Sequence, residues 1–216
     1  GRACHPETAL MTVAAPKVDR IAALHGQRWA VVGLGATGLS CARFLAARGA
    51  RVSVFDTREA PPNLDAVRAL GLGVECGPLD PEALSAFPHL AVSPGVPLDE
   101  PALSRAREQG AEIVGDIELF AWSTRAPVAA ITGSNGKSTV TTLAWRMLEA
   151  AGRRVRAGAN LGTPALELLD APDTEVFVLE LSSFQLDLTH TLAPTVACIL
   201  NITADHIDRH GTFEAY

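Results

Sequence analysis

Short apolar runs recur along the chain, and each is followed by turn residues and then by a stretch with helical spacing. Runs of aliphatic and β-branched residues bounded by turn residues are typical of buried strands, whereas apolar residues three and four apart indicate amphipathic helices. The pattern predicts strands at 28–32, 51–55, 73–76, 89–92, 112–114, 154–158, 175–181 and 195–200, and a short one that begins at residue 128. It predicts helices at 18–24, 39–48, 64–70, 99–109, 117–122 and 140–151. Strands that alternate with helices in this way indicate an α/β protein built on doubly wound parallel sheets.

The predicted elements fall into two series, and residues 123–127 are the expected linker between them. We therefore predict one domain at 18–124 and a second at 125–216. Residues 1–17 carry no clear periodicity at their start and are predicted to be a disordered extension. No predicted strand or helix closes the second series after residue 208, so this domain is expected to be incomplete.

Composition narrows the class of protein. The net charge of −6 argues against a nucleic-acid-binding surface, which is normally basic. No apolar run approaches the 18 or so residues of a membrane span, so no membrane insertion is expected. The four cysteines form no C-x-x-C pair, which favours free thiols and a cytoplasmic location.

The most informative stretch is the glycine-rich turn after the strand at residue 128, which reads Gly133-Ser134-Asn135-Gly136-Lys137-Ser138-Thr139. Such a turn directs backbone N–H groups and the positive end of a helix dipole at one point, where a phosphate chain binds. Lys137 adds a cation, and Ser138 or Thr139 offers a hydroxyl to Mg²⁺. The spacing is shorter than the common G-x-x-x-x-G-K-[ST], because Ile131 stands where the first glycine is expected. The turn predicts a nucleoside-triphosphate site.

A second glycine motif, Gly33-Leu34-Gly35-Ala36-Thr37-Gly38, follows the strand at 28–32, and Asp56 ends the next strand. This arrangement is typical of a Rossmann-like dinucleotide-binding unit, in which the acidic residue binds a ribose. The motif alone leaves three alternatives open: a redox dinucleotide, another diphosphate such as that of a UDP-sugar, or a turn that serves packing only. Thr57 and Arg58 can add contacts to an anionic ligand.

Polar residues at other strand ends complete the candidate site, because ligands of open α/β sheets collect beyond the carboxyl ends of the strands. Glu180 is a candidate magnesium ligand, and Ser182, Ser183 and Gln185 follow it in the same loop. Asn160 either contacts substrate or serves a turn. His206 lies between Asp205 and Asp208 and is a candidate ligand.

These motifs together resemble the Mur ligase family over residues 29–216. The segments that carry the resemblance are 33–40, 56–58, 93–96, 115–120, 131–139, 160–166, 179–186 and 201–209. Ser134-Asn135 before Gly136, and the run Ser182-Ser183-Phe184-Gln185, favour the D-glutamate-adding branch of that family. The resemblance implies a Rossmann-like N-terminal domain followed by a P-loop NTPase-like central domain.

The implied activity is that of an ATP-dependent amide ligase of peptidoglycan precursor synthesis, which adds D-glutamate to UDP-N-acetylmuramoyl-L-alanine. The carboxylate of the L-alanyl group attacks the γ-phosphate of ATP to give an acyl phosphate, and the D-glutamate amine then displaces phosphate. ATP and two Mg²⁺ ions are the implied cofactors, and a monomer is expected. The main alternative is an NAD(P)-binding oxidoreductase domain fused to an NTPase-like module.

The resemblance also implies residue roles. The ATP contacts are Gly133, Ser134, Asn135, Gly136, Lys137, Ser138 and Thr139. The substrate contacts are Ala36, Thr37, Asp56, Thr57, Arg58, Gly95, Asn160 and His206. The metal ligands are Ser138, Glu180 and His206, and the catalytic residues are Lys137, Glu180 and His206.

In the family, a carbamylated lysine soon after the position of Tyr216 shares the second metal, and a C-terminal domain carries much of the D-glutamate site. Neither lies in this sequence. We therefore expect this chain to bind the UDP-sugar weakly or moderately, to bind ATP poorly, and to turn over negligibly by itself.

Overall fold

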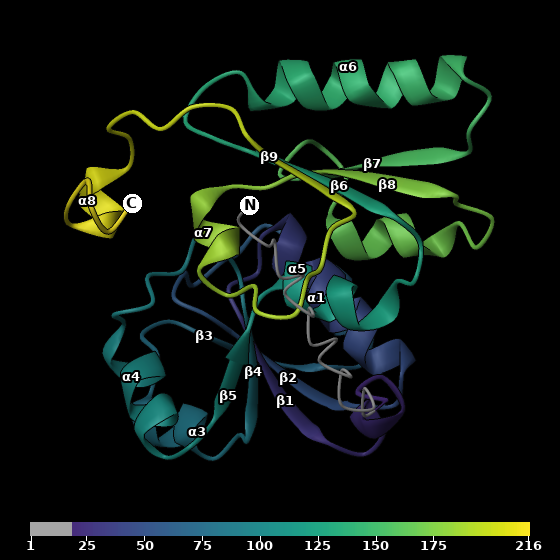
Figure 1. Cartoon of the computed structure of the whole chain (residues 1–216). Helices are drawn as coiled ribbons and strands as arrows, with labels where there is room; N and C mark the ends of the chain where they lie inside the picture. The colour runs from purple at the N-terminus through teal and green to yellow at the C-terminus, as the bar shows by residue number, and fades with distance from the viewer. Residues whose placement is uncertain (1–18) are drawn as a thin grey trace, which may run out of the picture.

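The computed structural model of the chain describes residues 19–216, which form two parallel sheets (Figure 1). The first sheet has the order β3-β2-β1-β4-β5 and the second the order β7-β8-β6-β9. The strands of the first sheet are β1 (Arg28–Val32), β2 (Arg51–Asp56), β3 (Gly73–Cys76), β4 (His89–Val92) and β5 (Glu112–Val114). Those of the second are β6 (Val128–Thr132), β7 (Val155–Ala159), β8 (Val176–Glu180) and β9 (Val196–Ile199). The α/β class and the parallel pairing are thus confirmed.

The helices of the first half are η1 (Ala22–Leu24), α1 (Ala36–Ala47), α2 (Leu64–Ala69), α3 (Pro81–Ser85), α4 (Pro101–Glu108) and α5 (Asp116–Ser123). Those of the second half are α6 (Lys137–Ala150), η2 (Ala165–Asp170), α7 (Ser183–Leu186) and α8 (Ile207–His210). Helix α6 lies along one face of the second sheet, at the top of Figure 1. None of the helices within residues 19–216 is both long and apolar enough to cross a bilayer.

Strand β1 shows why the first sheet has helices on both faces. Trp29 and Val31 belong to one apolar cluster, whereas Ala30 and Val32 belong to another on the opposite face. Successive side chains of a strand point to opposite faces, so a strand that is apolar throughout must be covered on both sides.

A single apolar cluster also joins the two sheets. It includes residues of α1 and α5 from the first half together with residues of β8 and η2 from the second. The rings of Phe120 and Phe177 meet edge to face with centroids 5.0 Å apart. The packing of α5 against η2 and β8 therefore fixes one sheet against the other.

Several predicted element boundaries were wrong. The helix expected at 18–24 is only the 3₁₀ turn η1, and residue 18 lies outside the described part of the chain. The helices expected from 39 and 140 start earlier, at Ala36 and Lys137, because each glycine turn runs directly into its helix. The helix expected from residue 99 starts at Pro101, whose fixed φ suits the first helical position. The short elements α3, η2, α7 and α8 were not predicted, since four to six residues show too little periodicity.

The boundary predicted between the two domains, at residues 124 and 125, stays a proposal. Helix α5 ends at Ser123 and β6 begins at Val128, which is where the linker was expected. The proposed extension at 1–17 lies outside the described residues.

Candidate active site

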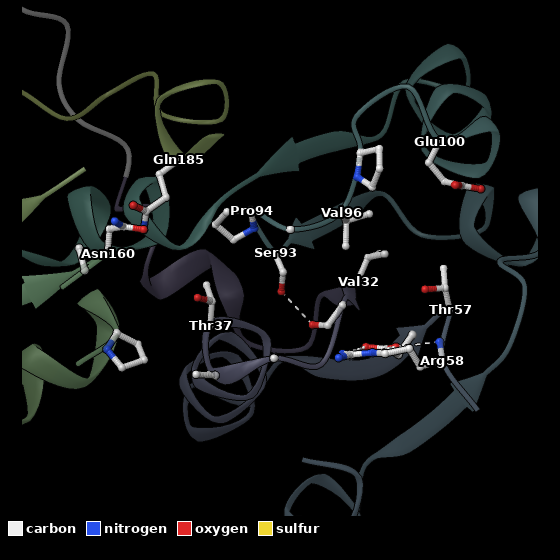
Figure 2. A pocket seen from close by; sticks show the side chains of 18 of the residues that line it. Val32, Thr37, Thr57, Arg58, Ser93, Pro94, Val96, Glu100, Asn160 and Gln185 are labelled. Atoms are coloured by element: carbon white, nitrogen blue, oxygen red, sulfur yellow. Dashed lines mark hydrogen bonds and ion pairs between the residues drawn. The ribbon is translucent and has the colours of Figure 1, made fainter. Parts of the chain in front are cut away.

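A cavity of about 600 Å³ opens where the carboxyl ends of the first sheet face the second sheet. Seven of the eight predicted substrate-binding residues line it: Ala36, Thr37, Asp56, Thr57, Arg58, Gly95 and Asn160. Figure 2 shows Thr57 and Arg58 at one end of the cavity, and Asn160 with Gln185 at the other. A site that spans both sheets at strand ends agrees with the rule for ligands of open α/β sheets.

The first glycine turn, between β1 and α1, is shaped by three glycines with different tasks. Gly33 has φ +89°, and a Cβ there would lie 2.8 Å from Cγ2 of Val96. A Cβ on Gly38 would lie 1.8 Å from the carbonyl oxygen of Gly33, so the helix can pack against the turn only without a side chain. A Cβ on Gly35 would meet nothing within 4 Å, although Gly35 lines the cavity. Gly33 and Gly38 thus serve the fold, whereas Gly35 leaves room for a ligand.

Asp56, at the end of β2, is held by four hydrogen bonds. Its Oδ2 accepts from the backbone N–H of Leu34 at 2.6 Å and from Nη2 of Arg58 at 2.6 Å. Its Oδ1 accepts from the backbone N–H of Arg58 at 2.9 Å and from Nε at 2.8 Å. The side-chain hydrogen bond from Arg58 is the main cause that lowers the pKa of Asp56 to about 2. The carboxylate is therefore ionised and already occupied, unlike one left free to bind the ribose of a dinucleotide.

The loop after β4 was only partly anticipated. Gly95 was predicted to bind substrate and does line the cavity, but Ser93 was not singled out. The Ser93 hydroxyl donates to the carbonyl oxygen of Gly33 at 2.8 Å and ties this loop to the glycine turn. Its position directly after a buried strand was the available signal.

The second glycine turn, between β6 and α6, has the backbone of a phosphate loop. Gly133 has φ +137° and Gly136 has φ +82°, conformations that favour glycine. The Nζ of Lys137 donates to the carbonyl oxygens of Gly133 at 2.7 Å and Ser134 at 3.0 Å. Ser138 and Thr139 are exposed at the start of α6. The lysine is thus folded onto its own turn, while the hydroxyls face solvent.

A segment after β9 braces this turn. The hydroxyl of Ser134 accepts from the backbone N–H of Thr203 at 2.9 Å and lies 2.7 Å from the hydroxyl of Tyr216. The side chain of Asn201 accepts from the N–H of Asn135 at 2.9 Å and donates to its carbonyl oxygen at 2.9 Å. Residues 201–203 therefore fix the path of the turn.

Glu180 ends β8, and Glu180 is paired with Ile131 of the adjacent β6, so it lies next to the phosphate turn in the sheet. Its Oε1 accepts from Nδ2 of Asn160 at 2.6 Å. Its Oε2 is buried and has no hydrogen-bond partner. A buried carboxylate oxygen without a partner is costly unless a cation or donor completes it. Glu180 thus fits the role of a magnesium ligand beside the turn.

His206 does not line the cavity, unlike the other seven predicted substrate contacts. It precedes α8 with φ +50°, and its side chain is half exposed. Its ring lies against Phe184, with centroids 4.8 Å apart, and its Nε2 lies 3.6 Å from Oδ2 of Asp205. No cluster of three or more His, Cys, Asp or Glu side chains with metal-site geometry occurs among residues 19–216. No hydrogen bond or ion pair joins His206 to Glu180, so the second metal site stays a prediction.

Two glycine turns of the phosphate-loop type on successive parallel sheets, with a cavity beside the first, are typical of two-unit α/β proteins that bind nucleotides. Residues 27–115 match the protein family described as "Mur ligase MurD-like, N-terminal domain". Residues 131–216 match the family described as "Mur ligase middle domain". The chain therefore belongs to the Mur ligase family.

Within that family, the chain is 53% identical over 188 residues to the UDP-N-acetylmuramoylalanine--D-glutamate ligase of Nitrosococcus oceani. It is 54% identical to the enzyme of the same name from Pseudomonas syringae pv. tomato. Each match covers 86% of this chain and 42% of the relative. The chain thus spans less than half the length of these curated relatives.

Solved structures agree on the fold. A Neisseria meningitidis UDP-N-acetylmuramate:L-alanyl-gamma-D-glutamyl-meso-diaminopimelate ligase matches with a TM-score of 0.54 and 21% identity, over 88% of this chain and 65% of that chain. A UDP-N-acetylmuramate-alanine ligase from Thermotoga maritima matches with a TM-score of 0.51 and 20% identity, over 87% of this chain and 44% of that one. At this identity the likeness supports the fold alone.

Proposed function

We propose that this chain is the UDP-sugar-binding part, and a portion of the ATP-binding part, of an ATP-dependent ligase that adds D-glutamate to UDP-N-acetylmuramoyl-L-alanine in peptidoglycan synthesis. The proposal rests on the family, on curated relatives of that name at 53% identity, and on the cavity between the sheets. Because the relatives are more than twice as long, the complete reaction is proposed for the whole protein and not for these 216 residues.

The single observation that carries the proposal is the cavity wall. One end presents Thr57 and the half-exposed guanidinium of Arg58, which suit a nucleotide. The middle presents Gly35 and Thr37 at the start of α1, where backbone N–H groups and the helix dipole favour a diphosphate. The other end presents Asn160 from the second sheet, beside Glu180. A UDP-sugar that extends across both sheets would place its acyl end next to the phosphate turn.

The chemistry proposed at that end needs charge neutralisation and positioning more than covalent help. The carboxylate of the L-alanyl group attacks the γ-phosphate of ATP, which breaks the β–γ phosphoanhydride bond and gives an acyl phosphate and ADP. The amine of D-glutamate then displaces phosphate from the acyl carbon, loses a proton and forms the amide. Lys137 would leave the carbonyl oxygens of Gly133 and Ser134 and neutralise the phosphates. Asn160 would hold the acyl end of the sugar while it keeps Glu180 in place.

Magnesium is the cofactor that the donor set suits. Ser138 and Glu180 would hold one Mg²⁺, because the exposed hydroxyl and the unpartnered Oε2 are hard oxygen ligands at the phosphate turn. A bound cation reduces the repulsion between the carboxylate and the phosphates. A second Mg²⁺ on His206 is proposed from the family resemblance alone. The cytoplasmic location is proposed from the cysteine pattern, and a monomeric state is proposed with it.

Isothermal titration calorimetry tests the proposal on the chain as it stands. We expect binding of UDP-N-acetylmuramoyl-L-alanine with weak or moderate affinity, weaker binding of UDP, poor binding of ATP and no turnover. Arg58→Ala should weaken both uridine ligands, whereas Arg146→Ala, on the exposed face of α6, should weaken neither.

The alternative, an NAD(P)-binding oxidoreductase domain, makes the opposite prediction. NAD(H) would then stabilise the chain in a thermal shift measurement and the UDP-sugar would not. That result would exclude the ligase proposal.

A further inference from the structure

Helix α5 of the first half holds α7 and the loop after it in the second half through two carboxylates. Glu118 accepts hydrogen bonds from the backbone N–H groups of His190 at 2.6 Å and Thr191 at 2.9 Å. It also accepts from the hydroxyl of Thr191 at 2.6 Å and from Nε1 of Trp122 at 2.8 Å. Glu118 does not line the cavity, so this contact serves the junction of the two halves.

Asp116, two residues earlier on α5, is different because its partner lines the cavity. Asp116 is 1% exposed, and its Oδ1 and Oδ2 accept from Nε2 of Gln185 at 3.4 and 3.2 Å. Gln185 is 4% exposed and borders the cavity at the same end as Asn160 (Figure 2). A first-half carboxylate thus reaches the sugar–peptide end of the site through a second-half amide.

Two neighbours, Asp116 and Ser182, decide which way the oxygen and the nitrogen of the Gln185 amide point. Its Oε1 accepts from the backbone N–H of Ser182 at 3.2 Å and lies 3.3 Å from the Ser182 hydroxyl. An ionised carboxylate only accepts hydrogen bonds, and a backbone N–H only donates. The amide can therefore satisfy both neighbours in one orientation only, with its nitrogen toward Asp116 and its oxygen toward Ser182.

Holding Gln185 with a buried carboxylate costs free energy, because the charged group is removed from water. Burial raises the pKa of Asp116 to about 6, against the lowering effects of the hydrogen bonds from Gln185 and from the backbone at the start of α5, and within residues 19–216 no Lys, Arg or His forms an ion pair with it. Across from it on α1, the Cys41 thiol has its pKa raised by burial and by the charge of Asp116. A buried carboxylate whose side-chain partner is a neutral amide is costly for the fold, which favours a task beyond packing.

We propose that Asp116 is a positioning residue that fixes the amide of Gln185 so that the second N–H of Nε2 donates to an oxygen of the sugar–peptide part of the ligand. An amide nitrogen carries two hydrogens, and the carboxylate of Asp116 engages one of them. The inference rests on the proposed function, because it assigns the occupant of this end of the cavity.

Four variants test it: Asp116→Asn, Gln185→Met, Gln185→Glu and the double variant Asp116→Asn/Gln185→Glu. Affinities for UDP-N-acetylmuramoyl-L-alanine and for UDP are measured by calorimetry, and folding is followed by thermal unfolding. Asp116→Asn should weaken binding of the UDP-sugar about tenfold, because a neutral amide is a weaker acceptor than the carboxylate and holds Gln185 less firmly, leaving only the backbone N–H of Ser182 to orient it. Gln185→Met should give the same loss without depending on the fold of the first variant. Binding of UDP should change by less than about twofold in both.

The double variant separates positioning from structure. Gln185→Glu alone sets two carboxylates against each other and should lower the melting temperature. Adding Asp116→Asn restores a donor–acceptor pair of reversed polarity and should recover the melting temperature. The affinity for the UDP-sugar should stay low, because residue 185 now presents only acceptors to the ligand.

Glu118→Gln is the matched control, since it perturbs the same helix and loop outside the cavity. It should lower the melting temperature and leave the affinity for the UDP-sugar unchanged. Recovery of affinity together with stability in the double variant, or wild-type affinity in Gln185→Met, would overturn the inference and leave the proposed function intact. Absence of UDP-sugar binding to the unmodified chain would instead overturn the proposed function and this inference with it.

Discussion

The two glycine turns of this chain look alike in sequence but are held in different ways. The turn at 33–38 is fixed within the first sheet by the hydroxyl of Ser93 and the carboxylate of Asp56, and it borders a cavity. The turn at 133–139 is fixed by residues 201–203, and its lysine is bonded to its own carbonyl oxygens. The first turn is ready for a diphosphate, whereas the second must release Lys137 before the lysine can contact one.

The sheets that carry these turns also differ in burial: the first is better buried than the second. The central strand β1 is flanked by β2 and β4 and is buried on both faces apart from its first residue. In the second sheet, β9 is an edge strand with all four residues exposed, including Val196 at 60% and Ile199 at 65%. The comparison indicates that the proposed uridine end of the site is preorganised in this chain and that the proposed ATP end is not.

The largest effect on stability should come from adding a side chain where α1 packs against the first glycine turn. Gly38→Ala places a Cβ 1.8 Å from the carbonyl oxygen of Gly33, so α1 must shift from β1. We expect a loss of about 3 kcal/mol or more in the free energy of unfolding, measured by urea denaturation. Gly73→Ala, with nothing within 4 Å of the added carbon, is the control and should cost less than about 1 kcal/mol. Equal losses in the two variants would refute the packing role of Gly38.

A second variant in the same turn should affect binding and spare the fold. Gly35→Ala adds a Cβ that meets no protein atom within 4 Å but points to space beside the cavity. We expect stability within about 1 kcal/mol of wild type and at least tenfold weaker binding of the UDP-sugar, because the diphosphate approaches the backbone here. Unchanged affinity would show that the ligand does not approach this turn.

Low pH should reduce the stability of the first half, because Asp56 becomes protonated. Its pKa is lowered to about 2 in the folded chain from an ordinary value of 3.8, so its contribution is present above pH 4 and is lost as the pH falls from about 4 to 2. Because Arg58 is half exposed, we expect only about 1 kcal/mol from this pair after solvent screening. The difference in unfolding free energy between wild type and Asp56→Asn should shrink over that pH range. A constant difference would contradict the ion pair as its source.

Lys137→Ala should have a small effect on folding and a selective one on ligands. It removes two hydrogen bonds to the turn, so we expect a change of about 1 kcal/mol or less in stability. Any thermal stabilisation by Mg²⁺ and ATP should disappear, while the affinity for the UDP-sugar should persist. Loss of UDP-sugar binding would mean that the two turns are not independent.

The smallest effect concerns the exposed edge. Ile199→Lys puts a charge on β9, where an apolar edge strand favours pairing between chains. We expect a stability change within about 0.5 kcal/mol, unchanged UDP-sugar affinity and less self-association in sedimentation velocity at high concentration. Unchanged self-association would exclude β9 as the contact.

Sequence patterns predicted the strands best. All nine expected strands occur, because each is a short and mostly apolar run that ends in a distinct turn. Helix starts were less predictable, as at Ala36 and Lys137, since the glycine motifs hide the first turn of each helix. The motifs and their positions at strand ends also predicted the candidate substrate residues well, because seven of the eight line one cavity.

Other features depend on contacts that no local pattern encodes. The contact of Asp116 with Gln185 joins residues 69 positions apart, and that of Ser93 with Gly33 joins residues 60 apart. The bonding of Lys137 to its own turn and the outlying position of His206 likewise follow from tertiary arrangement. Sequence identifies which residue types can do the chemistry, whereas the structure shows which of them meet.

The most direct test of the central claim is a calorimetric titration of the unmodified chain with UDP-N-acetylmuramoyl-L-alanine, followed by the same titration of Gly35→Ala and of Gln185→Met. The account predicts binding to the unmodified chain that is tighter than that of UDP and at least about tenfold tighter than that of either variant. No binding to a folded chain, or equal affinity in all three, would contradict a UDP-sugar site that spans the two sheets.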